Sequence, residues 1–92
     1  MEKNNLSQNN IKSILRKFIA ESFLPQAGLN TFDDKDSFME TGIIDSTGVL
    51  ELLEFIEDKF KIRVEDEEVI PANLDSLANL VSFIERKLSH AG

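Results

Sequence analysis

The sequence contains no cysteine and only one histidine, His90, which lies close to the C-terminus. Without cysteine the chain has no disulfide bond, no zinc site built from thiolates and no thiol nucleophile. Chain ends are commonly poorly ordered, so a serine–histidine–aspartate triad that depends on His90 is not expected. The residues that most often carry out nucleophilic catalysis are therefore missing or badly placed.

Long hydrophobic runs are also missing from this sequence. No apolar stretch approaches the roughly 18 residues of a membrane-spanning helix, and the first ten residues lack the hydrophobic core of a signal peptide. We therefore expect a cytoplasmic protein with no membrane insertion. The four glycines stand apart from one another, at positions 28, 42, 48 and 92, so the sequence has no glycine-rich phosphate loop.

Clustered acids at Asp33, Asp34 and Asp36 suggest a calcium loop, but their spacing does not fit one. A loop that starts at Asp34 places Met39 at the position where glycine is required. We therefore predict no metal site. Acids on the helix predicted over residues 46–60 face away from its apolar stripe, where carboxylates are normally solvated rather than catalytic. We expect no catalytic activity, and a small hydrolase remains as the enzymatic alternative.

Acidic residues outnumber basic ones by 17 to 10, which gives a formal net charge of −7. Phosphates repel such a chain, so nucleic acid and anionic lipid are not expected partners. Fourteen of the acids but only four of the bases lie between Asp33 and Asp75, which gives this segment a charge of −10. We infer that the middle of the chain recruits basic protein partners.

Apolar residues at helical spacing predict an all-α domain. Hydrophobic residues make up 41% of the 92 positions, as in a globular protein of one domain. The three main helices are expected from about residue 8 to just before Pro25, over residues 46–60, and over about 77–88. They form a small bundle with one short acidic helix over residues 65–70, which ends at Pro71.

A long first loop, residues 25–45, joins the first two predicted helices. It carries scattered apolar anchors, so we expect it to be ordered, with a short helical turn near Asp36–Glu40. Residues 8–88 are predicted to form the domain. Residues 1–7 and 89–92 are predicted to be flexible ends.

The segment Gly42-Ile43-Ile44-Asp45-Ser46 leads into the acidic helix predicted over residues 46–60. With the long loop before it, and the short helix and the last apolar stripe after it, the sequence resembles the acyl carrier protein family over about residues 8–88. In that family the serine that follows an aspartate at the start of the second helix receives 4′-phosphopantetheine. The resemblance places this covalent cofactor on Ser46, preceded by Asp45.

Physical chemistry is consistent with a modified serine at this position. A helix start presents the hydroxyl of Ser46 outward, and free N–H groups and the helix dipole favour the negative charge of a phosphodiester there. An alternative remains open, because serine is a common helix cap without any further function. In that case the protein is a non-catalytic acidic helical adaptor.

A second Asp-Ser pair occurs at Asp75-Ser76-Leu77, before the last predicted helix. Only about 15 residues follow it, and no acidic helix face lies beyond it. We interpret it as a structural cap, in which Asp75 satisfies backbone donors of the last helix and Leu77 enters the core.

Two residues after Ser46 depart from the fatty-acid members of the family. Thr47 stands where those members usually have an apolar residue, and Gly48 costs up to about 1 kcal/mol of helix propensity in the first turn. These departures favour a specialised carrier over housekeeping fatty-acid synthesis. The acyl pathway, whether fatty acid, polyketide or another, stays open at this point.

The resemblance implies a monomeric carrier that presents acyl thioesters to other proteins. Its partners would be a phosphopantetheinyl transferase, an acyl-loading ligase or transferase, and acyl-processing enzymes with basic docking patches. The residues expected to contact these partners are Glu40, Asp45, Thr47, Leu50, Glu51, Glu54, Glu57 and Asp58.

Seven apolar residues of the second and last predicted helices are expected to lie inside the bundle. They either form a packed core or line an interior that accepts an acyl chain: Val49, Leu53, Ile56, Phe60, Leu80, Val81 and Ile84.

Overall fold

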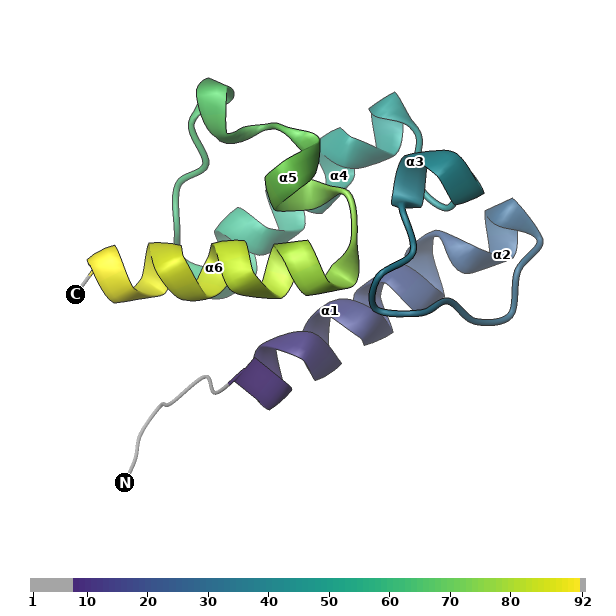
Figure 1. Ribbon diagram of the computed structural model, residues 1–92, viewed down its shortest axis with the longest axis horizontal. Coiled ribbons are helices and arrows are strands. Elements are labelled where there is room, and N and C mark those ends of the chain that lie inside the picture. The colour runs from purple at the N-terminus through teal and green to yellow at the C-terminus, as the bar shows by residue number, and fades with distance from the viewer. Residues whose placement is uncertain (1–7, 92) are drawn as a thin grey trace.

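Three helices of 15 residues each form the frame of the structure, a computed structural model that describes the backbone of residues 8–91 and the side chains of residues 10–89. They are α1 (Gln8–Ser22), α4 (Ser46–Phe60) and α6 (Leu77–Ala91). Figure 1 shows α6 in front of α4, with α1 beneath them in that view. The segment 1–7, predicted to be flexible, lies outside the described residues, as does Gly92.

Four short elements lie between the main helices. They are α2 (Leu24–Ala27), α3 (Phe38–Thr41), the 3-10 turn η1 (Asp66–Glu68) and α5 (Pro71–Leu74). In the part of the chain that the structure describes, no residue belongs to a strand. The prediction of a small all-α bundle with three main helices and a long ordered first loop is confirmed.

Two prolines start helices where the sequence predicted that they end them. The chain leaves α1 at Phe23 and turns at once into α2, whose first turn contains Pro25. Pro71 likewise stands at the start of α5 rather than only closing the acidic turn before it. The N–H groups of a first helical turn have no acceptor within the helix, so proline is tolerated there. The prediction missed both short helices for this reason.

The long loop is fixed to α1 by a cluster of charged and aromatic groups. Lys12 Nζ lies 2.5 Å from an Asp34 carboxylate oxygen, and Arg16 pairs with the other oxygen. Arg16 also donates to the carbonyl oxygen of Phe32 at 2.9 Å and lies over its ring, 4.5 Å from the ring centre. Phe32 in turn contacts Phe38 edge to face inside the core. The loop is therefore ordered by charge and by burial.

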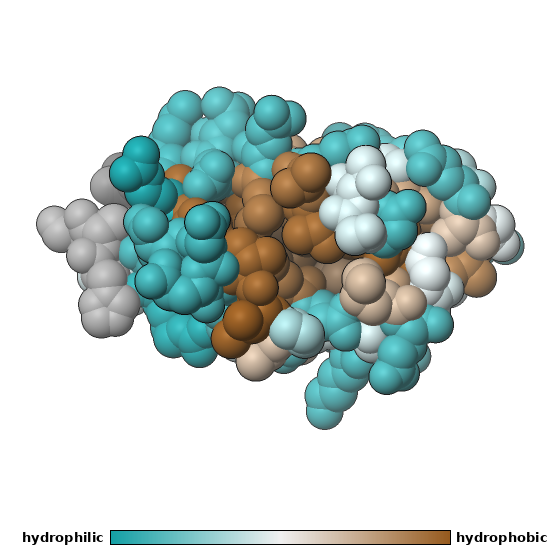
Figure 2. Space-filling view, turned by 90° about the horizontal axis from the view of Figure 1, so that it is seen from above, coloured by the Kyte–Doolittle hydropathy of each residue, from teal (hydrophilic) through white to brown (hydrophobic). Residues whose placement is uncertain are grey.

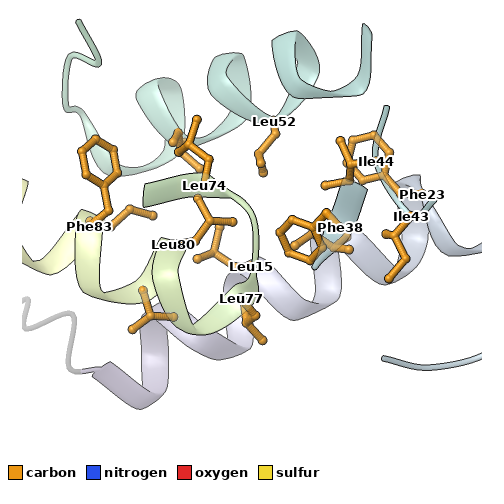
Figure 3. Packing of buried hydrophobic residues seen from close by; sticks show 14 of the residues in the cluster. Leu15, Phe23, Phe38, Ile43, Ile44, Leu52, Leu74, Leu77, Leu80 and Phe83 are labelled. Atoms are coloured by element: carbon orange, nitrogen blue, oxygen red, sulfur yellow. The ribbon is translucent and has the colours of Figure 1, made fainter. Parts of the chain in front are cut away.

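The core of the bundle draws side chains from every α-helix. Leu15, Leu52, Leu77 and Leu80 are fully buried, and Phe38 is almost so. Figure 3 shows Leu52 of α4 and Leu74 of α5 pointing into the space between these two helices. Each such side chain stabilises the fold by about 1.5–3 kcal/mol when it leaves water.

The buried stripe of α4 differs from the predicted one. Leu52 is fully buried, whereas Val49 and Leu53 are only partly buried; Ile56 and Phe60 are buried as predicted. The difference begins at Gly48, where an added Cβ would lie only 2.9 Å from the side chain of Ile44. Because glycine lets this turn approach the core closely, the helix turns the face of Gly48 and Leu52 inward. Predictions for the last helix hold, since Leu80, Val81 and Ile84 are buried.

The last helix begins and ends differently from the prediction. Ser76 caps it, because its hydroxyl oxygen accepts from the N–H of Asn79 at 3.1 Å. Asp75 does not cap α6, since its carboxylate reaches across to α3 instead. At the other end α6 continues to Ala91, so residues 89–91 extend this helix where the sequence predicted a tail.

Candidate functional site at the start of helix α4

The first turn of α4 is capped by Asp45 and not by Ser46. Asp45 has extended backbone angles, and its carboxylate accepts from the N–H of Gly48 at 2.7 Å. Its carbonyl oxygen accepts from the N–H of Val49 at 3.0 Å. Ser46 is the first residue within the helix. The capping role that the alternative interpretation gave to Ser46 is therefore wrong.

Ser46 is exposed, and its hydroxyl does not cap the helix. Among residues 8–91, no protein group forms a hydrogen bond with this hydroxyl, and the N–H groups of Ser46 and Thr47 have no protein acceptor. A helix start with free N–H groups carries a partial positive charge. The site thus combines an accessible nucleophilic oxygen with donors that favour a negatively charged substituent.

The chain before Ser46 is held in place by α3 and by two buried isoleucines. Gly42 ends α3 with a positive φ of 79°, a conformation that glycine adopts without strain. The N–H of Ile44 donates to the carbonyl oxygen of Phe38 at 3.3 Å, and Ile43 and Ile44 are both buried. These contacts fix the direction from which the chain enters α4, and with it the position of Ser46.

Asp75, which comes much later in the sequence, stabilises the same region. Its carboxylate accepts from the hydroxyl of Ser37 and from the N–H of Met39, the latter at 3.0 Å. Its carbonyl oxygen accepts from the N–H of Phe38 at 2.8 Å. The start of α3 is therefore tied to the turn before α6. Sequence reasoning missed this role because the partners are 36 or more residues apart.

The predicted partner-contact residues divide into two groups. Exposed side chains on α4, at its entry and on α3 make up the larger group: Glu40, Asp45, Thr47, Leu50, Glu51, Glu54 and Asp58. Glu57 differs, because it is only half exposed and its carboxylate accepts from the N–H of Val64 at 2.8 Å. It ties the end of α4 to the chain that follows. In the described part of the chain, no ion pair engages Glu51, Glu54 or Asp58.

A hollow of about 230 Å³ adjoins Asp45 on one side of the helix start. Its wall combines Thr47 and Glu51 of α4 with Phe23 and Gln26 from the corner between α1 and α2. Asp45, Thr47 and Glu51, which the sequence predicted as contact residues, therefore meet around one concave surface.

An apolar groove of about 160 Å³ lies on the other side, between α4 and the segment that contains α5. Figure 2 shows hydrophobic surface in a band across this face, with hydrophilic areas on either side. The groove is lined by Phe38, Met39, Ile44, Val49, Leu52, Val69, Ile70, Pro71, Leu74 and Asp75.

Sequence reasoning identified only Val49 among these lining residues. Val69 and Ile70 stand in a short acidic segment outside the three main apolar stripes, and the structure leaves both of them exposed, with Met39. Apolar residues outside the three helix stripes were a signal that could have indicated the groove, but the sequence analysis did not use it. Leu53, Ile56 and Phe60, predicted as interior residues, do not line it.

The described residues offer neither a metal site nor a membrane-spanning helix. None of them form a group of three or more histidine, cysteine or acidic side chains able to hold a metal ion. No helix within residues 8–91 has the length and apolar character needed to cross a bilayer.

Comparison with known proteins gives one informative result. No family model matches this chain. The chain is 26% identical over 80 residues to a protein named probable acyl carrier protein PigG, from Serratia sp.. The aligned region covers 87% of this chain and 91% of that protein. The near full-length similarity, together with an all-α bundle built on three main helices, supports the assignment of this chain to the acyl carrier protein family.

Proposed function

We propose that this protein is an acyl carrier that bears 4′-phosphopantetheine on Ser46 and holds acyl intermediates as thioesters on that arm. One observation carries the proposal. The hydroxyl of Ser46 is exposed and free of hydrogen bonds within the described residues, because Asp45 provides the helix cap. The similarity to a probable acyl carrier protein supports the same role.

The residues at the start of α4 suit this cofactor chemically. Its phosphodiester would lie beside the free N–H groups of Ser46 and Thr47, where the helix dipole stabilises an anion. The arm supplies a terminal thiol, which this cysteine-free chain lacks. The chain's own task is to position the arm and to present it to other proteins.

Attachment needs only the oxygen of Ser46 and a transferase. The Ser46 oxygen forms a bond to the phosphorus of the pantetheine phosphate of coenzyme A, and the pyrophosphate bond breaks. Adenosine 3′,5′-bisphosphate leaves, and the hydroxyl proton passes to a base of the transferase. No group of this chain besides the hydroxyl takes part in the bond changes.

The acidic surface of α4 supports a presenting role. Glu51, Glu54 and Asp58 are exposed and free of ion pairs within the described residues, so they can attract basic patches on a transferase, a loading enzyme and acyl-processing enzymes. Leu50, with 67% of its surface exposed, adds an apolar contact one turn after Ser46. We propose a non-catalytic carrier that works through these contacts.

A specialised acyl pathway fits the polar Thr47 beside the attachment site. Gly48 no longer argues for a loose helix start, because it is buried and a Cβ at this position would lie too close to Ile44 and Phe23, which gives the glycine a packing role. We therefore rest this part of the proposal on Thr47.

Intact-mass spectrometry tests the attachment. The purified chain is incubated with coenzyme A and several phosphopantetheinyl transferases, including one of broad specificity. We expect a gain of about 340 Da, the calculated mass of the arm. Ser46→Ala should abolish the gain, whereas Ser76→Ala, at the buried serine of the second Asp-Ser pair, should retain it.

Three outcomes would contradict the proposal. If no transferase adds the arm, the protein is better described as an acidic adaptor. If the purified chain without an arm turns over ester or thioester substrates, the hydrolase alternative gains support. A gain in mass that survives Ser46→Ala would move the site to another residue.

A further inference from the structure

The hollow of about 230 Å³ lies on the other side of Ser46 from the apolar groove. Successive residues of a helix turn by about 100°, so Thr47 and Glu51, which line the hollow, lie about 100° and 140° round α4 from Ser46. Val49 and Leu52, which line the groove, lie about 60° and 120° round in the opposite direction. Ser46 therefore stands between two concave surfaces.

The floor of the hollow is apolar. Phe23 and Ile43 line it and are buried, with only 5% and 4% of their surfaces exposed. Figure 3 shows both side chains at the same end of the core. Gly48 also lines the hollow, and an added Cβ there would lie 3.0 Å from the ring of Phe23. Because glycine has no side chain, the ring of Phe23 borders the hollow.

The rim of the hollow is polar. Gln26 of α2 and Thr47 and Glu51 of α4 line it with exposed side chains. Within the described residues, none of these three side chains takes part in a hydrogen bond or an ion pair. They offer an amide, a hydroxyl and a carboxylate, which together can both donate and accept. The hollow thus presents unengaged polar groups around an apolar floor.

The part of the pantetheine arm nearest to Ser46 has the same division. Beyond the phosphate it carries a pair of methyl groups on one carbon, and these are followed by a hydroxyl and an amide. The methyl groups suit the floor formed by Phe23 and Ile43, whereas the hydroxyl and the amide suit the polar rim. The phosphate itself would stay at the free N–H groups of Ser46 and Thr47, outside the hollow.

The size of the hollow also fits this part of the arm. An apolar cavity of about 150 Å³ binds benzene, which corresponds to about 25 Å³ for each non-hydrogen atom. At that density, the hollow of about 230 Å³ holds about nine such atoms. The stretch from the carbon next to the phosphate to the first amide nitrogen has about this number. The rest of the arm, with its thiol or thioester, would extend beyond the hollow.

We propose that the hollow is a docking site for the proximal half of the arm, with an apolar floor for its methyl groups and Gln26, Thr47 and Glu51 around its hydroxyl and amide. This inference rests on the proposed attachment of the arm to Ser46. Because the arm is tethered beside the hollow, its effective concentration there is in the millimolar range, so weak contacts are enough to hold it. Thr47 and Glu51 are also expected partner contacts, so the arm and a partner compete for the same surface.

Nuclear magnetic resonance of the modified protein tests the docking. The arm is transferred to Ser46 from isotope-labelled coenzyme A, and the product is purified away from the transferase. We expect the methyl signals of the arm to shift from their positions in free coenzyme A, because they lie against the ring of Phe23, and to show nuclear Overhauser contacts with its ring protons. The first amide N–H of the arm should exchange with water more slowly than in free coenzyme A.

A matched pair of variants locates the arm. Gln26→Ala removes a rim group of the hollow, and Met39→Ala removes an exposed side chain that lines the groove. We expect Gln26→Ala to return the arm signals toward those of free coenzyme A and Met39→Ala to leave them unchanged. Ala27→Trp, which fills the hollow from α2, should abolish the Overhauser contacts with Phe23. If Ala27→Trp fails to fold, Thr47→Val, which removes only a rim hydroxyl, serves as the second variant and should act as Gln26→Ala does.

The outcomes separate this inference from the proposed function. Arm signals that match those of free coenzyme A would overturn the docking while leaving the attachment to Ser46 intact. Signals that respond to Met39→Ala and not to Gln26→Ala would also overturn it, since they would place the arm on the side of the groove. Failure of every transferase to add an arm would overturn the proposed function and, with it, this inference.

Discussion

Two Asp-Ser pairs begin two 15-residue helices in this protein, and the structure treats them in opposite ways. At the start of α4, Asp45 caps the helix, and Ser46 stands exposed within the first turn. At the start of α6, Ser76 caps the helix from a buried position, and Asp75 turns away toward α3. A one-residue difference in where the helix begins decides which serine is engaged and which is free.

The comparison teaches that a dipeptide does not define a site. In both places an oxygen of the pair accepts from the N–H of the third residue of the helix, as helix starts require. When the aspartate does this, the serine is left with nothing to bind and remains accessible. When the serine does it, the aspartate is free to bind elsewhere in the fold.

The largest stability effect is expected from the aspartate at the second pair. Asp75→Ala removes the acceptor of two hydrogen bonds, from the hydroxyl of Ser37 and the N–H of Met39. Because hydrogen bonds to charged groups contribute about 1.5–3 kcal/mol each when protected from water and less when exposed, we expect a loss of about 2 kcal/mol in the free energy of unfolding.

Urea denaturation of the variant measures this loss. Asp58→Ala, at an exposed position without an ion pair in the described structure, is the control and should change the value by less than about 0.5 kcal/mol. If Asp75→Ala were as mild as the control, the tie between α3 and the turn before α6 would not contribute to stability.

A smaller effect should separate the two serines. Ser76→Ala removes a buried cap and should cost about 1 kcal/mol. Ser46→Ala removes a hydroxyl without a hydrogen bond in the described structure, and alanine is a good helix former, so its effect should stay within about 0.5 kcal/mol. The free energies of unfolding of both variants without the arm, from the same denaturant series, test this. Equal losses would mean that Ser46 has a structural role after all.

Much of the fold could be predicted from the sequence because helical periodicity is a local signal. The stripe that includes Leu80 and Ile84 depends only on neighbours in the chain, and it is buried as expected. The order of local features along the chain also carried the resemblance that led to Ser46, whose role stays a prediction and whose side chain is exposed. Pro25 and Pro71 misled the prediction, because a proline that starts a helix and one that ends a helix look alike without the flanking geometry.

The missing parts depend on contacts between segments distant in the sequence. The carboxylate of Asp75 accepts from the N–H of Met39 in α3, 36 residues earlier in the chain, and no local sequence pattern indicates this contact. Leu52 becomes buried in place of Leu53 because Gly48 brings one face of α4 against Ile44 and Phe23. The groove was missed for the same reason, since most of its lining comes from α3, α4 and residues 69–74, which are far apart in the sequence.

The smallest expected effect concerns the acids that are paired, in contrast to the free acids of α4. A hydrogen bond from Lys12, helped by Arg16, lowers the pKa of Asp34 below its ordinary value of 3.8, although partial burial opposes the shift. A backbone hydrogen bond from Glu65 and the contact with Lys87 lower the pKa of Glu68 below 4.5. A carboxyl whose pKa falls on folding stabilises the protein above its unfolded pKa, and that contribution is lost as the pH falls through the folded value.

We therefore expect Asp34 and Glu68 to make a constant contribution to the free energy of unfolding above about pH 5.5. The contribution of Glu68 should fall as the pH drops below 4.5, and that of Asp34 as the pH drops below 3.8. Asp34→Asn and Glu68→Gln should each flatten part of this fall, whereas Glu54→Gln on the free face of α4 should leave its slope unchanged. Urea midpoints measured between pH 6 and pH 3 check this. If Glu54→Gln flattened the fall as much as the other two, the ion pairs of Asp34 and Glu68 would not account for the loss of stability in acid.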